Sequence, residues 1–198
     1  MKYKKLLNKI QSETGLESPQ ERREILITAM RENERKGNDC LKCSGRCCTF
    51  EANSMNMTNL EALEALAFLE DEGLINDELI ERLVKSVKEF RLDSMLQIGK
   101  GEFYRKSYTC PFFNFPTWGC GLGAKNKPYG CIAFNPRESG QVNGGNCNSN
   151  LEIQMKRLFF HEDKEREASS LIAEEFKVAN DKSSIPMKLL ELLNSKVI

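Results

Sequence analysis

Apolar residues recur at helical spacing over much of the chain. Residues 3–13 place four apolar side chains on one face of a short helix, which Gly15 ends. Residues 18–21 (Ser-Pro-Gln-Glu) are typical of a helix start and predict a second helix that ends near Gly37. The expected buried face of this second helix consists of Ile25, Leu26, Ala29 and Met30.

Two capping boxes and one capping asparagine mark three more helices. Residues 58–61 (Thr-Asn-Leu-Glu) open a helix that runs to about Glu72. Asn76 caps the next helix, whose apolar positions recur cleanly as far as Phe90. Residues 149–152 (Ser-Asn-Leu-Glu) open a long helix that is expected to continue to about residue 179.

The remaining segments are less regular. The charged stretch 161–167 interrupts the apolar pattern of the long helix and indicates either a solvated face or a bend. A last short helix begins around Pro186 and carries four leucines. Residues 99–109 alternate and are rich in aromatics, which predicts a short strand or hairpin, whereas residues 110–148 are rich in Gly, Pro and Asn and predict loops.

These elements predict a mainly α protein, in which a helical scaffold surrounds an irregular, loop-rich cysteine region with at most a short β-hairpin. We expect one domain over residues 1–198. Its expected parts are N-terminal helices (1–37), a cysteine-cluster metal-binding region (40–148) and C-terminal helices (149–198).

The composition is ordinary except for cysteine. The chain has 198 residues, of which 40% are hydrophobic and 29% charged, and its formal net charge is zero. This balance argues against a generally cationic binder, so no nucleic-acid or membrane partner is expected. No apolar run has the length of a signal peptide or of a membrane span, which favours the cytoplasm. In a reducing compartment, eight cysteines indicate metal binding or redox chemistry rather than disulfides.

The cysteines fall into two groups that lie far apart in the sequence. The first group is Cys40, Cys43, Cys47 and Cys48, and the second is Cys110, Cys120, Cys131 and Cys147. The mainly helical residues between the groups could return the second to the first. A C-x2-C turn brings two thiolates within reach of one ion. All eight cysteines are therefore candidate metal ligands.

Two points about these ligands stay open. Cys47 and Cys48 are adjacent, so their side chains are expected to diverge and to face two metals, two corners of a cluster, or one metal and one core pocket. Any single cysteine could instead be a small buried hydrophobe, and for Cys147 the two interpretations are evenly balanced.

The basic residues near the cysteines are consistent with a metal centre that carries net negative charge. Residues 99–137 carry six basic side chains and one acid, and Lys42 and Arg46 lie within the first cysteine group. Four thiolates around a divalent metal or a [4Fe-4S] cluster leave a net negative charge, which nearby cations would offset. The alternatives are a solvated basic face or a site for a small anionic substrate or nucleic acid.

The cysteine pattern resembles that of the zinc- or iron-chelating CxxCxxCC family, the YkgJ-type cysteine-cluster proteins. The resemblance covers roughly residues 40–137. It rests on CLKCSGRCC (40–48), the helix start at Thr58, Cys110-Pro111-Phe112, and the pair Cys120 and Cys131. The family's Arg-Pro-x-x-Cys-Arg pattern is altered here, because Lys127 and Ile132 replace its two arginines. The spacing between Cys43 and Cys47 is also one residue longer than the family's.

The resemblance implies metal chelation and little more. A related motif occurs in the larger flagellin lysine methylases, which use an iron–sulfur cluster and S-adenosylmethionine. The present sequence has no glycine-rich strand–turn–helix fingerprint for that cofactor, so methyltransferase activity is not transferred.

The spacings favour an iron–sulfur cluster slightly over Zn²⁺. Structural zinc usually takes two C-x2-C pairs, and this sequence has one such pair followed by widely spaced single cysteines. Phe112, Phe113, Phe115 and Trp118 could shield a cluster or could be ordinary core. The single histidine, His161, is expected to be solvated or partly packed, and the acidic residues of the helices are expected on solvated faces.

The function predicted from the sequence is metal binding through clustered thiolates. One alternative is a metal-dependent enzyme, in which Lys125, Lys127 and Arg137 would surround an open metal position and an anionic substrate or protein side chain. The other is a zinc-stabilised module that recruits a protein partner. No catalytic residue stands out in the sequence.

Overall fold

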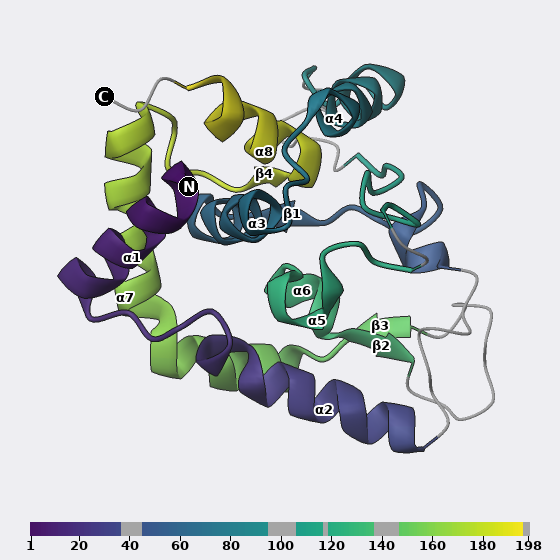
Figure 1. Ribbon diagram of the computed structural model, residues 1–198. Helices are drawn as coiled ribbons and strands as arrows, with labels where there is room; N and C mark the ends of the chain where they lie inside the picture. Colours follow the sequence, from purple (N-terminus) through teal and green to yellow (C-terminus); the bar gives the residue numbers. More distant parts are fainter. Residues whose placement is uncertain (37–44, 95–105, 117–118, 137–146, 196–198) are drawn as a thin grey trace, which may run out of the picture.

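The computed structural model is mainly helical, as the sequence pattern predicts, with two small antiparallel sheets (Figure 1). It describes residues 1–36, 45–94, 106–116, 119–136 and 147–195. The α-helices there are α1 (Lys2–Thr14), α2 (Glu24–Arg35), α3 (Asn59–Asp71), α4 (Asp77–Glu89), α5 (Gly123–Asn126), α6 (Tyr129–Ile132), α7 (Leu151–Phe176) and α8 (Ile185–Asn194). Strand β1 (Asn56–Met57) pairs with β4 (Ser183–Ser184), and β2 (Phe134–Pro136) pairs with β3 (Cys147–Ser149).

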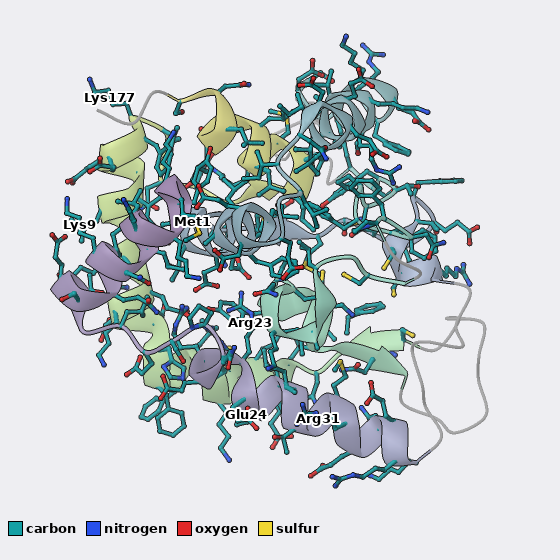
Figure 2. All side chains as sticks on the ribbon, viewed as in Figure 1. Met1, Lys9, Arg23, Glu24, Arg31 and Lys177 are labelled. Atoms are coloured by element: carbon teal, nitrogen blue, oxygen red, sulfur yellow. The ribbon has the colours of Figure 1, made fainter. Side chains whose placement is uncertain are left out.

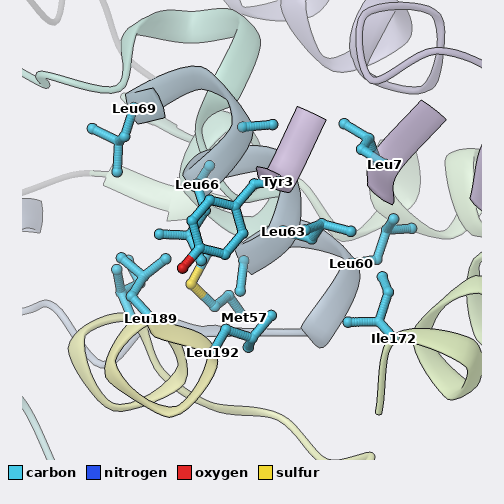
Figure 3. Close-up of a cluster of buried hydrophobic side chains, with 14 of the residues drawn as sticks. Tyr3, Leu7, Met57, Leu60, Leu63, Leu66, Leu69, Ile172, Leu189 and Leu192 are labelled. Carbon is cyan, nitrogen blue, oxygen red and sulfur yellow. The ribbon is translucent and has the colours of Figure 1, made fainter. Parts of the chain in front are cut away.

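Helix α3 is the centre of the main hydrophobic core, where α1, α7 and α8 pack around it. Ten of its 13 residues are buried. Figure 3 shows the leucines of α3 among apolar side chains of the surrounding elements, including Tyr3, Leu7, Met57, Ile172, Leu189 and Leu192. A helix enclosed in this way must also place its polar residues in the interior, and Glu61 and Glu64 are both buried.

A buried network of charges joins α3 to α2 and α7. Arg22 and Arg23 lie in a 3-10 turn (η1, Glu21–Arg23) before α2, and both side chains are fully buried. Glu64 accepts from Arg22 and lies 2.6 Å from Arg23. Arg22 also lies 2.8 Å from Glu165 of α7. In Figure 2 Arg23 lies between α2 and α6, on the inner side of α2.

Most of the predicted helices are confirmed. Gly15 ends α1 with a left-handed backbone (φ 62°), and Asn76 caps α4 through the Leu79 amide. The helix around Pro186 is α8. The charged stretch 161–167 lies within the continuous helix α7, which runs beside α2 near its start and beside α1 near its end (Figure 1).

Several predicted details of the helices are wrong. The helix start predicted at residues 18–21 opens the 3-10 turn η1 instead, and α2 begins at Glu24. On α2 the buried side chains are Leu26, Ile27 and Met30, so Ile25 and Ala29 are only partly buried. The reason is that Arg22 and Arg23 already define the inner face of this segment. Leu26 and Ile27 follow them by four residues and therefore lie on the same face.

The start and end of α7 also differ from the prediction. Its cap is Asn150, which accepts from the Ile153 amide, rather than Ser149. Ser149 is held in β3 opposite Phe134, so the helix begins one residue later. The helix ends at Phe176, where Lys177 adopts a left-handed backbone (φ 56°), and not at residue 179.

The strand or hairpin predicted for residues 99–109 is not seen in the part that the structure describes. Residues 106–109 form no strand, and residues 99–105 lie outside the described residues, as do Gly37–Asp39 at the predicted end of α2. Within the described residues the β-structure is β1–β4 and β2–β3, and the second of these lies inside the predicted loop region.

Replacing Thr58 by Ala is expected to lower the free energy of unfolding by about 1 kcal/mol, because the cap of α3 is lost. The Thr58 hydroxyl accepts from the Glu61 amide at 3.1 Å, and the Glu61 carboxylate accepts from the Thr58 amide at 2.8 Å. Urea unfolding measures the change. Thr58→Ser is the matched control because it keeps the hydroxyl, and equal losses in both variants would contradict the capping explanation.

Candidate metal centre

Cys47 and Cys48 lie in a short 3-10 turn, η3 (Arg46–Cys48). Gly45 precedes it with φ 73°, and a Cβ at this position would lie 2.2 Å from the Phe113 ring. Glycine is therefore required here for its backbone and for its lack of a side chain. The Cys47 and Cys48 Sγ atoms lie 4.0 Å apart. Two thiolates on one tetrahedral zinc are separated by about 3.8 Å, so the expectation that these side chains diverge is wrong.

Cys110 lies directly beside this turn, although 62 residues separate it from Cys48 in the sequence. Its amide donates to the Cys48 carbonyl at 2.7 Å. The Tyr108 amide donates to the Asn53 carbonyl at 2.9 Å, and the Asn53 side chain donates to the Tyr108 carbonyl at 2.9 Å. The helices between the two cysteine groups thus return the chain to the first group, as the sequence pattern suggests.

Three other segments bring the remaining described cysteines to the same place. Cys120 faces Phe113 across an isolated β-bridge. Cys131 lies in α6, and its amide donates to the Pro128 carbonyl at 2.9 Å. Cys147 is in β3, opposite Pro136. Gly121 makes the turn after Cys120 possible, because a Cβ there would lie 1.7 Å from the Phe115 carbonyl oxygen.

All six described cysteines line one cavity of about 270 Å³. They are Cys47, Cys48, Cys110, Cys120, Cys131 and Cys147, and each is half-buried. No disulfide joins any two of them. Sulfur atoms gather in this part of the molecule in Figure 2. Lys127, Met55 and Phe113 also line the cavity.

Burial and mutual repulsion disfavour the ionised form of several of these thiols. Burial, followed by the charge of Cys120, raises the pKa of Cys110 to about 12. Burial and the charges of Cys110 and Cys120 raise the pKa of Cys131 well above its ordinary value. The hydrogen bond between the adjacent pair lowers the pKa of Cys47 to about 7 and raises that of Cys48. Among the described residues, Lys127 is the cation that lowers the pKa values of Cys47, Cys110 and Cys131, and it offsets only part of the effect of burial.

Of the basic residues expected around the cysteines, Lys127 is the one described residue that lines the cavity. Lys125 is exposed, Lys106 donates to the Arg91 and Ser94 carbonyls, and Arg46 pairs with Glu51 at 3.1 Å. Outside the described residues lie Lys42, Lys100, Arg105 and Arg137.

The aromatic residues near the cysteines divide into two kinds. Phe112 and Phe115 are buried in the main core, whereas Phe113 lines the cavity. Trp118 lies outside the described residues. His161 is partly packed, with its Nδ1 3.3 Å from a Glu17 carboxylate oxygen, and it does not line the cysteine cavity.

Two supports of this site were not predicted from the sequence. Met55 adds a thioether to the cavity wall, and its carbonyl accepts from the buried Tyr108 hydroxyl at 2.5 Å. The second support is the charge network, because Arg23 donates to the Lys127 carbonyl at 3.0 Å. The buried carboxylate of Glu61 accepts from the Tyr129 amide at 2.9 Å. The acidic residues of α3 therefore hold the segment that carries Cys131, and the expectation that they are solvated is wrong for Glu61 and Glu64.

The sulfur atoms are not arranged as a closed ligand set. Among the described residues, no group of three or more His, Cys, Asp or Glu side chains could hold one ion. Cys40 and Cys43, the C-x2-C pair of the sequence, lie outside the described residues.

No protein-family model, curated protein or solved structure matches this chain. The likeness to the CxxCxxCC family therefore depends on the sequence motifs alone and stays a prediction. In the described part of the chain, no helix is both long enough and apolar enough to cross a bilayer.

Proposed function

We propose that this chain holds a metal centre through clustered thiolates, and that the centre is an iron–sulfur cluster. One observation carries the proposal: six cysteines from five separate segments of the chain line a single cavity. Cysteines that served only as small core residues would be expected to disperse among apolar neighbours. These six are half-buried and gather at one cavity, although Cys110, Cys120 and Cys131 also pack against the main core.

The chemistry of the donor set fits a soft metal centre. Thiolates and thioethers are the ligands that iron–sulfur clusters, zinc and Cu(I) prefer, and Met55 adds a thioether to the six thiols. Burial beside other thiols raises the pKa values of Cys110 and Cys131. A bound metal cation would stabilise the thiolate forms of both side chains and so offset this effect. Lys127 would offset the residual negative charge of the loaded centre.

The volume of the cavity favours a cluster over a single zinc ion, because both take four thiolate ligands and the number of cysteines does not decide between them. A structural zinc sits in a closed tetrahedron, with Zn–S distances of about 2.3 Å. The cavity of about 270 Å³ is larger than one such ion needs. When bound, an iron–sulfur cluster supplies one-electron chemistry, and Phe113 and Met55 would limit the access of water to it.

The deciding experiment is analysis of iron, zinc and acid-labile sulfide on protein purified without oxygen, together with a visible spectrum. We expect iron with matching sulfide and broad absorbance near ~400 nm. A variant with Ser at positions 48, 110, 120 and 131 is expected to lose most of both. Thr28→Ser, on the exposed side of α2, is the control for purification.

Each other result would count against a stated part of the proposal. Zinc without sulfide would contradict the cluster. Unchanged metal content in the four-serine variant, with its helical circular dichroism retained, would contradict the thiolate centre itself.

A further inference from the structure

The first half of α7 exposes a stripe of large apolar side chains. Leu151, Met155 and Phe159 recur every four residues on one face and are 68%, 64% and 85% exposed. Phe160 is 62% exposed and packs edge-on against Phe159, with ring centroids 5.5 Å apart. The two rings alone expose ~300 Å² of apolar surface, which is the size of the largest apolar patch on many monomers, and such patches are often functional.

Over the first half of α7, the stripe lies on the side away from the interior of this chain. Arg157 is buried there and donates to the Arg22 carbonyl at 2.8 Å. Successive residues of a helix are rotated by about 100°, so the stripe is directed about 160° away from Arg157. In the second half of α7, Ser169 and Ala173 share the direction of the stripe and are buried, so the exposed face is confined to the first half. Within the described residues, nothing covers it.

We propose that the stripe is the seam of a homodimer, in which α7 packs antiparallel against α7 of a second copy about a two-fold axis at Met155. With a rise of about 1.5 Å per residue, Leu151 and Phe159 lie ~6 Å on either side of Met155. In the antiparallel pair, Leu151 is level with the partner's Phe159, and Met155 meets the partner's Met155. Every position of the seam is then apolar.

The charges beside the stripe select a second copy as the occupant. Glu152 and Lys156 lie on the same border of the stripe, and a two-fold axis places this border against the same border of the partner. Glu152 is then offset by only ~3 Å along the axis from the partner's Lys156. Within the part of the chain that the structure describes, neither residue has an ion-pair partner. The dimer would give them two equivalent pairs.

The expected dimer is weak. A standard interface buries about 800 Å² per partner, and the stripe supplies only part of this area. We therefore expect dissociation in the micromolar range, which sedimentation velocity of the full, metal-loaded chain over a wide range of concentrations would measure.

Phe159→Glu is expected to raise the dissociation constant roughly a hundredfold, because a charge replaces the most exposed ring of the seam. Ile80→Glu is the matched control, since Ile80 is an exposed apolar residue (38%) on α4, outside the stripe. A wild-type chain that stays monomeric at every concentration would overturn the proposal. So would equal self-association of the Phe159→Glu variant.

A charge exchange tests the antiparallel geometry. Glu152→Lys and Lys156→Glu each place like charges together, so each should weaken its own dimer roughly tenfold. When the two variants are mixed, both pairs become complementary, and a heterodimer should form at wild-type concentrations. Native mass spectrometry with one variant ¹⁵N-labelled detects it. Weakened homodimers without a heterodimer would overturn the two-fold arrangement, and the result does not depend on any metal centre.

Discussion

Glu64→Gln is expected to destabilise the protein by about 3–5 kcal/mol, because it removes the negative charge that Arg22 and Arg23 share. The side chains of both arginines are fully buried, and that of Glu64 is 1% exposed. Gln keeps the shape of the side chain but leaves Arg23 without its carboxylate, whereas Arg22 retains Glu165. A loss of this size is a large fraction of the 5–15 kcal/mol that holds a typical domain folded. Urea unfolding measures it.

Glu13→Gln is the control for this substitution. Glu13 is half exposed and lies 4.0 Å from Lys9 on the surface of α1, where an ion pair contributes about 0–1 kcal/mol. A second variant separates charge from packing: Arg23→Met in the Glu64→Gln background removes the orphaned cation and should recover part of the loss. If Glu64→Gln alone changes stability no more than Glu13→Gln does, the network contributes little.

This network also marks the limit of what the sequence could predict about the fold. Arg22 and Arg23 look like ordinary charged residues at a helix start, and Glu64 looks like one of many helix acids. Their burial depends on partners 41 to 143 residues away, which no local pattern encodes. By contrast, Gly15, Thr58 and Asn76 act within one helical turn, and they were predicted correctly.

The same distinction applies to the candidate site. The eight cysteines were identifiable because their residue type and spacing carry the chemistry. The sequence pattern only suggested which segments contact each other. The hydrogen bond between Cys110 and Cys48 depends on how α3 and α4 lead the chain back to the first cysteine group. The contributions of Met55 and Gly45 depend on residues that are near them in space but not in the sequence. Of the basic residues expected near the cysteines, Lys127 is the one that lines the cavity among the described residues.

The proposed centre also predicts how its metal affinity depends on pH. With Co²⁺ alone as the probe, the affinity of the metal-depleted protein is expected to rise about a thousandfold per pH unit from pH 7 to 8. Metal ligands must be thiolates, and the pKa values of Cys48, Cys110 (about 12) and Cys131 are all above this range. Each of these thiols therefore loses its proton on binding, and each contributes about a factor of ten per pH unit.

The slope should become steeper below pH 7. The pKa of Cys47 is about 7 because Cys48 donates a hydrogen bond to it and Lys127 lies nearby, so a fourth proton begins to compete with the metal there. Competition with a chromophoric chelator at several pH values measures the slope. Cys110→Ser should reduce the slope between pH 7 and 8 to about a hundredfold per unit, whatever it does to the affinity itself. An affinity that does not change with pH would show that protonated thiols of this cavity are not the ligands, and would contradict the thiolate centre independently of which metal the purified protein contains.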